Sequence, residues 1–367
     1  MKEKLKYYSL KNILAKDAQY NIIFGERSNG KTYACLRYAL DRYFKYGEQF
    51  GLVRRWREDF QSKRGQTMFD AHIANGVISE LSDGVWTGVF YQSGRWWLSK
   101  IDKDGKKFVS DEPIGYAFAL SNMEHDKSTS YPKITTIIFD EFLTRDTYQQ
   151  DEFVLFMNIV STIVRQRDNV KIFMLGNTVN KSSPYFNEMG LKHISQMKKG
   201  NIDVYTYGDS KLRVAVEYAD SISKKGKPSD IYFAFDNPKL HMITGGEWEI
   251  GLYPHRPVKY VPKDILFTYF IKWETDILQC EIVQVDNNLF TFIHRKTTEI
   301  KDEDSDLVFS LEYDARPNWI RNILKTNTNV TKKILKFFKE DKVFYQDNDV
   351  GEIVRNYLQW CGTVKMG

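Results

Sequence analysis

The sequence predicts an α/β protein: a mostly parallel sheet with helices on both faces, followed by a smaller α+β domain. Through residue 218, short continuous apolar runs alternate with helix-length segments, as in parallel strands that are buried on both faces. From residue 265 onward the apolar runs form a meander, and two amphipathic segments follow them. A length of 367 residues also favours two domains over one.

The first domain is expected to span residues 1–218. A helix is predicted at residues 33–44, because apolar residues recur there at helical spacing, and an inserted hairpin at residues 88–100. The predicted strands of its sheet are residues 19–24, 49–55, 116–121, 135–141, 170–177, 203–207 and 214–218.

Residues 219–262 are polar and interrupted by Gly and Pro, which indicates a linker or lid. The second domain is expected at residues 263–367. Its predicted elements are strands at 266–273, 278–285 and 289–294 and helices at 330–342 and 349–361.

The composition is that of a water-soluble globular protein, with 42% hydrophobic and 28% charged residues. No apolar run approaches the roughly 20 residues that span a bilayer, and the N-terminus lacks the apolar centre of a signal peptide, so no membrane segment is expected. Cys35, Cys280 and Cys361 match no metal spacing, which favours reduced thiols in a cytoplasm. The net charge of +5 permits a polyanionic partner without requiring one.

The segment from Gly25 to Thr32 has the spacing of a phosphate-binding P-loop, between a predicted strand and a predicted helix. Glycines let the backbone wrap around a phosphate, and the helix N-terminus directs free N–H groups at it. Lys31 can reach the β- and γ-phosphates of ATP, and the Thr32 hydroxyl can ligate Mg²⁺. The residues expected to bind the nucleotide are Gly25, Glu26, Arg27, Ser28, Asn29, Gly30, Lys31 and Thr32.

Asp140 and Glu141 follow a strongly apolar strand run and are the natural partners of the P-loop. An aspartate at the carboxyl end of a buried strand can hold Mg²⁺ through its water shell. The adjacent glutamate can then act as the general base that activates the attacking water. A surface Asp-Glu pair is the alternative, but the apolar run before it favours a catalytic pair.

Asn177 ends another predicted strand and can contact the γ-phosphate or the attacking water; a plain turn residue is the alternative. A motor ATPase also needs a mobile cation for the charge that develops on the γ-phosphate, and Arg165 and Arg167 are candidates. A second group, Arg54, Arg55 and Arg57, can meet phosphate or DNA, or can be a solvated strand edge. GTP specificity is not supported, since Ser183 stands where guanine recognition would need an aspartate.

Several segments together resemble the genome-packaging, terminase-like ATPases of small podophages with protein-primed linear double-stranded DNA. The resemblance covers about residues 15–190. Besides the P-loop, it is carried by Phe44-Lys-Tyr-Gly-Glu-Gln-Phe50, Val53-Arg-Arg55, Tyr131-Pro132, Thr136-Ile-Ile-Phe-Asp-Glu-Phe142, Arg165-Gln-Arg167, Asn177 and Pro184-Tyr-Phe186.

The resemblance implies a P-loop ATPase of the additional-strand, catalytic-glutamate type that works as a ring, a pentamer in the family. It implies that an arginine of the neighbouring subunit triggers ATP hydrolysis, and Arg165 matches that position best. Lys127 and Arg57 fall where the family has basic residues for nucleotide exchange or subunit communication, although relatives have lysine at the position of Arg57. The implied C-terminal domain resembles an RNase H-like nuclease that has lost catalysis.

The resemblance also implies the partners and the place of action. The ring would act on double-stranded DNA at the portal, or connector, of an empty capsid. Its location would be the portal vertex of the procapsid in the host bacterial cytoplasm, and it would be absent from the mature virion. A structural RNA is a further partner that the resemblance leaves open.

The residues of the second domain argue against nuclease activity. A two-metal nuclease needs acidic ligands on its central strands, and the predicted strand 266–273 contains none. The acidic run 302–306 is read as a solvated loop. From Lys263 to the end, 15 Lys and Arg stand against 17 Asp and Glu, a net charge of −2, so the remainder of the chain carries +7. A DNA grip is therefore expected mainly on the ATPase domain, although Lys332, Lys333, Lys336 and Lys339 form a local basic helix face.

The leading hypothesis is a motor that couples ATP hydrolysis to packaging of double-stranded DNA into a phage head. Two alternatives remain at this point: another nucleic-acid ATPase, such as a helicase or a DNA-partitioning motor, and an ATP-gated portal adaptor without useful turnover. The intact Asp140-Glu141 pair argues against the adaptor.

Overall fold

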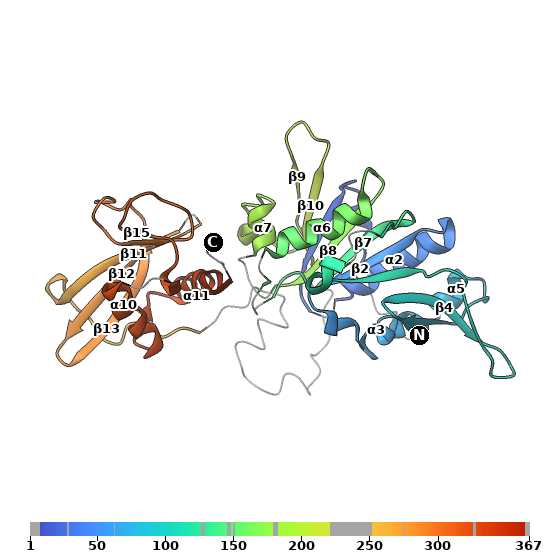
Figure 1. Ribbon diagram of the computed structural model, residues 1–367, viewed down its shortest axis with the longest axis horizontal. Coiled ribbons are helices and arrows are strands. Elements are labelled where there is room, and N and C mark those ends of the chain that lie inside the picture. The colour runs from blue at the N-terminus through green and yellow to red at the C-terminus, as the bar shows by residue number, and fades with distance from the viewer. Residues whose placement is uncertain are drawn as a thin grey trace. The chain divides into compact units, whose positions relative to one another are not determined.

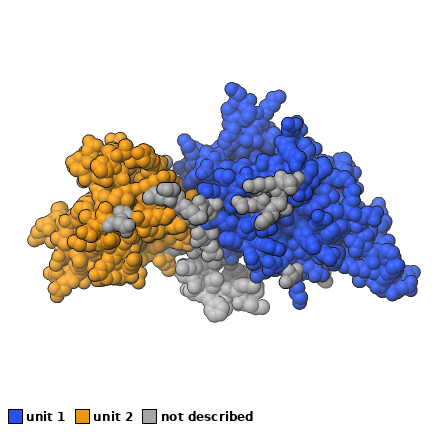
Figure 2. All heavy atoms as spheres, in the orientation of Figure 1, with its two compact units in different colours: residues 1–249 blue, residues 250–367 orange. Residues whose placement is uncertain are grey.

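The computed structural model describes residues 8–363 except 28, 62, 126–128, 145–147, 150, 179–182, 221–251, 275 and 326–327. The chain forms two compact units, residues 1–249 and 250–367, which are distinguished by colour in Figure 2. Most of the expected linker, residues 219–262, lies outside the described residues.

A single large sheet runs through the first unit (Figure 1). Its strands follow the order β3-β4-β6-β2-β7-β8-β1-β10-β9, and β5 pairs with β4 outside this path. The six strands from β6 to β10 pair in parallel, and β3, β4, β5 and β9 join antiparallel. The strands are β1 (Tyr20–Gly25), β2 (Gln49–Arg54), β3 (Gly88–Gln92), β4 (Arg95–Ile101), β5 (Lys107–Val109), β6 (Gly115–Ala119), β7 (Ile134–Asp140), β8 (Lys171–Asn177), β9 (Ile202–Thr206) and β10 (Arg213–Tyr218).

Helices cover both faces of this sheet because its central strands are apolar on both sides. In β7, Ile137 and Phe139 enter one core and Ile138 the other. The first core lies under α6 (Glu152–Val164) and α7 (Pro184–Glu188); the second lies under α2 (Lys31–Tyr46). The remaining short helices of this unit are α1 (Lys11–Leu14), η1 (Arg57–Phe60), α3 (Lys63–Thr67), α4 (Asp70–Ala74), α5 (Val77–Leu81), η2 (Leu120–His125) and η3 (Ile194–Gln196).

The second unit is a six-stranded sheet in the order β15-β14-β11-β12-β13-β16, with its two longer helices on one face. That face buries Tyr269 and Cys280 against Ile334 of α10 and Tyr357 of α11. Its elements are η4 (Pro262–Asp264), β11 (Ile265–Trp273), β12 (Asp276–Val285), β13 (Asn288–Lys296), β14 (Val308–Ser310), β15 (Trp319–Ile320), η5 (Ile323–Lys325), α10 (Asn329–Lys339), β16 (Val343–Tyr345) and α11 (Asn348–Thr363).

The predicted fold class is confirmed: the first unit is α/β with a mostly parallel sheet, and the second is α+β. The sequence did not reveal the short helices α3–α5 or the strands β14–β16. Elements of two to five residues span too few turns or alternations to leave a periodic pattern. All three cysteines are buried free thiols. Among the described residues, no helix has the length and apolar character that crossing a membrane requires.

Candidate nucleotide-binding site

The P-loop lies between the end of β1 and the start of α2, as its motif predicts. Gly30 is the residue before the helix and has a φ of 90°, in the left-handed region where a side chain is strained. At Gly25, a Cβ atom would lie 3.0 Å from the carbonyl oxygen of Ala219, the residue after the neighbouring strand β10. Both glycines are therefore required by the path of the loop, which delivers the free N–H groups of α2 to one place.

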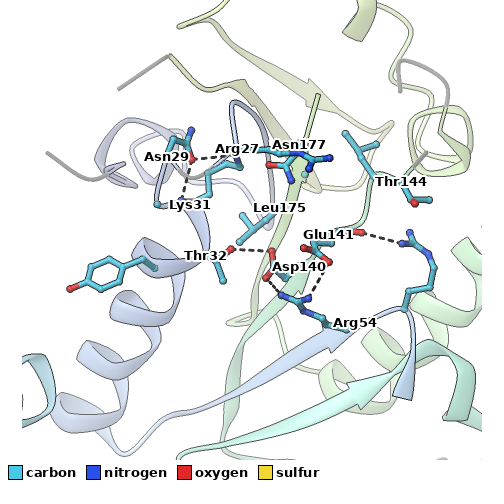
Figure 3. A pocket seen from close by; sticks show the side chains of 15 residues that line it. Arg27, Asn29, Lys31, Thr32, Arg54, Asp140, Glu141, Thr144, Leu175 and Asn177 are labelled. Atoms are coloured by element: carbon cyan, nitrogen blue, oxygen red, sulfur yellow. Dashed lines mark hydrogen bonds and ion pairs between the residues drawn. The ribbon is translucent and has the colours of Figure 1, made fainter. Parts of the chain in front are cut away.

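A pocket of about 730 Å³ opens beside this loop, within the size range of small-molecule sites (Figure 3). The P-loop forms one wall, and the carboxyl ends of β2, β7 and β8 form the others. The lining residues are Arg27, Asn29, Gly30, Lys31, Thr32, Tyr33, Arg54, Arg55, Asp140, Glu141, Leu143, Thr144, Leu175, Gly176 and Asn177.

Lys31 folds back onto its own loop. Its Nζ donates hydrogen bonds to the carbonyl oxygen of Glu26, at 2.7 Å, and to Asn29 Oδ1, at 3.2 Å. Burial lowers the pKa of Lys31 to about 8, although Asp140 and Glu26 act in the opposite direction. A buried ammonium with so few compensating charges favours an anionic ligand.

Thr32 and Asp140 meet across the pocket, where the Thr32 hydroxyl donates to Asp140 Oδ1 at 3.0 Å (Figure 3). A hydroxyl and a carboxylate are the hard oxygen ligands that Mg²⁺ prefers, so these two residues fit the predicted metal role. Asn177 also lies in the pocket wall, at the end of β8 and in register with Gly25.

Arg54 holds the two acidic residues from the neighbouring strand (Figure 3). Its Nη2 donates to Asp140 Oδ2 at 2.7 Å, and its Nη1 donates to Glu141 Oε2 at 3.1 Å. Burial lowers the pKa of Arg54, but the two carboxylates outweigh burial and the net shift is upward. This role of Arg54 was not predicted from the sequence. There, Arg54 belonged to a group of arginines expected to meet phosphate or DNA, or to form a solvated strand edge.

The two arginines after α6 have different surroundings. Arg165 is exposed and has a φ of 51°; its guanidinium contacts the carbonyl oxygens of Thr129 and Thr162 at 3.2 and 3.4 Å. The Arg167 guanidinium donates instead to four carbonyl oxygens, of Tyr131, Pro132, Ile134 and Ile163. Arg167 thus ties the loop before β7 to α6, and Arg165 is the one placed to reach outward.

Arg57, another predicted residue, does not line this pocket. Arg57 is exposed in η1, and its backbone N–H donates to Ser121 Oγ at 3.2 Å. The predicted residues Ser28 and Lys127 lie outside the described residues. Conversely, Tyr33, Leu143, Thr144, Leu175 and Gly176 line the pocket without a sequence signal of their own.

Curated relatives that align with this chain are DNA packaging proteins of Bacillus phages. That of phage phi29 is 30% identical over 188 residues, which are 50% of each protein. That of phage B103 is 32% identical over 183 residues, 49% of this chain and 50% of the relative. The chain thus matches about half the length of these relatives.

Solved structures of two packaging motors share the fold of this chain. The Phi-28 gp11 DNA packaging motor aligns over 99% of both chains with a TM-score of 0.56 and 17% identity. The bacteriophage Phi-29 viral genome packaging motor assembly aligns over 95% of this chain and 96% of its own, with a TM-score of 0.54 and 20% identity.

A family model described as podovirus DNA encapsidation protein (Gp16) matches residues 1–80 and 96–226, more than half of the chain. The matched residues include the P-loop, Asp140 and Glu141, Asn177 and both arginines after α6. The chain belongs to the podovirus DNA encapsidation protein (Gp16) family.

Proposed function

We propose that the protein is the ATPase of a phage DNA-packaging motor, which hydrolyses ATP in this pocket to drive double-stranded DNA into an empty capsid. The observation that carries the proposal is one pocket that combines Lys31 and Thr32 of a P-loop with Asp140 and Glu141. Membership of the encapsidation family and the packaging relatives support the task of the motor.

Each of these residues has a separate role in the proposed reaction. Lys31 and the N-terminal N–H groups of α2 would bind the phosphates, and Thr32 and Asp140 would hold Mg²⁺. The metal would offset the charge that builds up on the phosphate oxygens. Glu141 would accept the proton of the attacking water, and Asn177 would orient that water or the γ-phosphate.

Arg54 sets a condition for this role of Glu141. Arg54 Nη1 donates to Glu141 Oε2 at 3.1 Å, so separation of this pair would free that carboxylate oxygen to accept a hydrogen bond from the attacking water. Bound phosphates would give Arg54 an alternative anionic partner, which links the arrival of the nucleotide to the release of the base.

The motor would work as a homo-oligomeric ring, a pentamer by family resemblance, in which Arg165 enters the site of a neighbouring subunit. The exposure of Arg165 at the end of α6 supports the choice of Arg165 over Arg167 for this role. Arg57 and Lys127 are proposed to assist nucleotide exchange or communication between subunits. The partners would be DNA phosphates, with little sequence reading, the portal and the empty capsid, and a structural RNA as a further candidate.

The proposed division of the chain is an ATPase domain at 1–218, a linker or lid at 219–262 and a nuclease-like domain without catalysis at 263–367. The protein would act at the portal vertex in the host cytoplasm and leave before the virion matures.

Two observations support a second domain without nuclease catalysis. β11 contributes no acidic side chain, and the described part of the chain contains no group of three or more His, Cys, Asp or Glu residues that could hold a metal.

Glu141→Gln is expected to bind ATP normally and to lower turnover by at least 100-fold, because the amide cannot accept the proton. The measurement pairs ATP affinity with the DNA-stimulated ATPase rate, and with DNA packaging into purified empty capsids. A variant that hydrolyses ATP at the original rate would disprove the assignment of Glu141.

Arg165→Ala is expected to retain ATP binding and to abolish turnover, since it removes a cation that can contribute roughly 10³–10⁵ in rate. Mixing it with Lys31→Ala subunits should restore part of the hydrolysis, because intact sites then meet intact arginines across some interfaces. An ATPase assay over a range of mixing ratios tests this. Absence of any recovery would argue against an arginine that acts in the neighbouring site.

ATP affinity is expected to fall as pH rises through about 8, the pKa to which burial lowers Lys31. Below this pH the ammonium is already charged; above it, binding has to take up a proton, so Kd should rise by up to tenfold per pH unit. Titrations between pH 7 and 9.5 test this, with Lys31→Ala as a control that binds weakly and shows no such step. Constant affinity of the unaltered chain across that range would contradict the prediction.

No cleavage of linear or supercoiled DNA is expected from the full chain with Mg²⁺ or Mn²⁺, because the described residues of the second unit include no acidic metal framework. A gel assay of DNA integrity measures this. Metal-dependent cleavage that persists in the Glu141→Gln variant would show that the second unit is an active nuclease.

A further inference from the structure

A buried ion pair at the wall of the nucleotide pocket has no role in the chemistry proposed above. Arg55 is the residue after β2, and Glu152 is the first residue of α6. The guanidinium Nε and Nη2 donate to Glu152 Oε2 and Oε1, both at 2.8 Å. The side chain of Glu152 is fully buried and that of Arg55 is 8% exposed. Arg55 therefore cannot contact DNA, which is one of the roles that the sequence suggested for it.

Further contacts lock this pair in place. The Tyr185 hydroxyl donates to Glu152 Oε1 at 2.8 Å, and the Gln149 backbone N–H donates to Oε2 at the same distance. The side chain of Gln149 donates in turn to the Arg55 carbonyl oxygen at 2.7 Å. The ring of Tyr148 lies 5.1 Å from the guanidinium carbon. Three separate segments of the chain thus converge on one buried charge pair.

The outer edge of the guanidinium reaches the backbone of the proposed catalytic base. Arg55 Nη1 donates to the carbonyl oxygen of Glu141 at 3.2 Å, and Nη2 donates to that of Phe142 at 2.8 Å. Two successive carbonyl groups are therefore fixed by one rigid, planar group. A lysine ammonium could not make the same set of bonds, because its donors radiate from a single point.

The backbone at Glu141 needs such a restraint. Its φ is 60°, a left-handed conformation that is strained for a residue with a side chain. The Glu141 side chain is 60% exposed, so packing does not define its position. Once Glu141 has parted from Arg54, the orientation of the backbone decides the direction in which the carboxylate leaves the chain.

We propose that Arg55, locked by Glu152 and Tyr185, is a positioning residue that holds the Glu141 backbone in its left-handed conformation and so aims the catalytic carboxylate at the γ-phosphate. The inference rests on the proposed role of Glu141 as the general base. It assigns a function to a buried ion pair that stability alone does not explain, since such pairs are often no more stable than apolar replacements.

The decisive experiment separates positioning from stability with the double variant Arg55→Met/Glu152→Gln in the full chain. Arg55→Met alone leaves a buried carboxylate without its cation and should lower both Tm and kcat. The double variant removes both charges and should regain most of the Tm. Its kcat should stay about 10- to 100-fold low, the range that a misplacement of about 1 Å can cause, while Kd for ATP changes less than threefold.

Two further variants sharpen the comparison. Tyr185→Phe keeps the ring and removes a single hydrogen bond to Glu152, so a smaller decrease in kcat is expected.

Arg42 and Glu48 provide a control away from the site. They form a second bidentate pair, with donor–acceptor distances of 2.8 and 2.6 Å, and neither lines the pocket. The control double variant Arg42→Met/Glu48→Gln, at a more exposed pair, should leave kcat unchanged.

Recovery of kcat together with Tm in Arg55→Met/Glu152→Gln would overturn the proposal and leave the pair a purely structural role. An equal loss of kcat in the Arg42/Glu48 double variant would also overturn it, because the effect would then not be specific to Glu141. Failure of the proposed function has a different signature: Glu141→Gln itself would keep full turnover.

Discussion

The parallel pairing of β2, β7, β8 and β1 is the constraint on which the site depends. Parallel strands end at the same edge of a sheet, so the P-loop after β1 meets Asp140 and Glu141 at the carboxyl end of β7 and Asn177 at the end of β8. Arg54 is the last residue of β2 at that edge, and Arg55 is the residue after it. Their side chains diverge: Arg54 enters the pocket, and Arg55 is buried behind Glu141.

The charged side chains of the pocket bond to groups of the protein itself. Lys31 is bonded to its own loop, and Arg54 bonds to both carboxylates. A polyanion that binds in the pocket has to replace these contacts with its own, but it does not disturb the Arg55–Glu152 pair.

Helix α6 joins the surroundings of the proposed base to the proposed trans-acting arginine. Glu152 is its first residue and Arg165 follows its last, and its 13 residues span about 20 Å.

The sequence predicts the parts of the site that are local in the chain. The P-loop is a contiguous motif with a strand before it and a helix after it, and Asp140 and Glu141 follow an apolar run. The partners of Arg54, Arg55 and Arg167 could not be predicted, because they depend on which strands are neighbours and on the side to which each side chain turns. Family resemblance favours Arg165 over Arg167, but the carbonyl groups that hold the Arg167 guanidinium could not be predicted from the sequence. The strand order itself, with β1 between β8 and β10, also depends on long-range packing that no short motif encodes.

A structure of the assembled protein with Mg²⁺ and a nonhydrolysable ATP analogue tests the central claim most directly. The account predicts the γ-phosphate between Lys31 and Glu141, with Lys31 released from the Glu26 carbonyl oxygen. It also predicts that Arg54 has parted from Glu141, while Arg55 still bonds the carbonyl oxygens of Glu141 and Phe142. A nucleotide bound elsewhere, or one bound here with Arg54 still paired to Glu141, would contradict it.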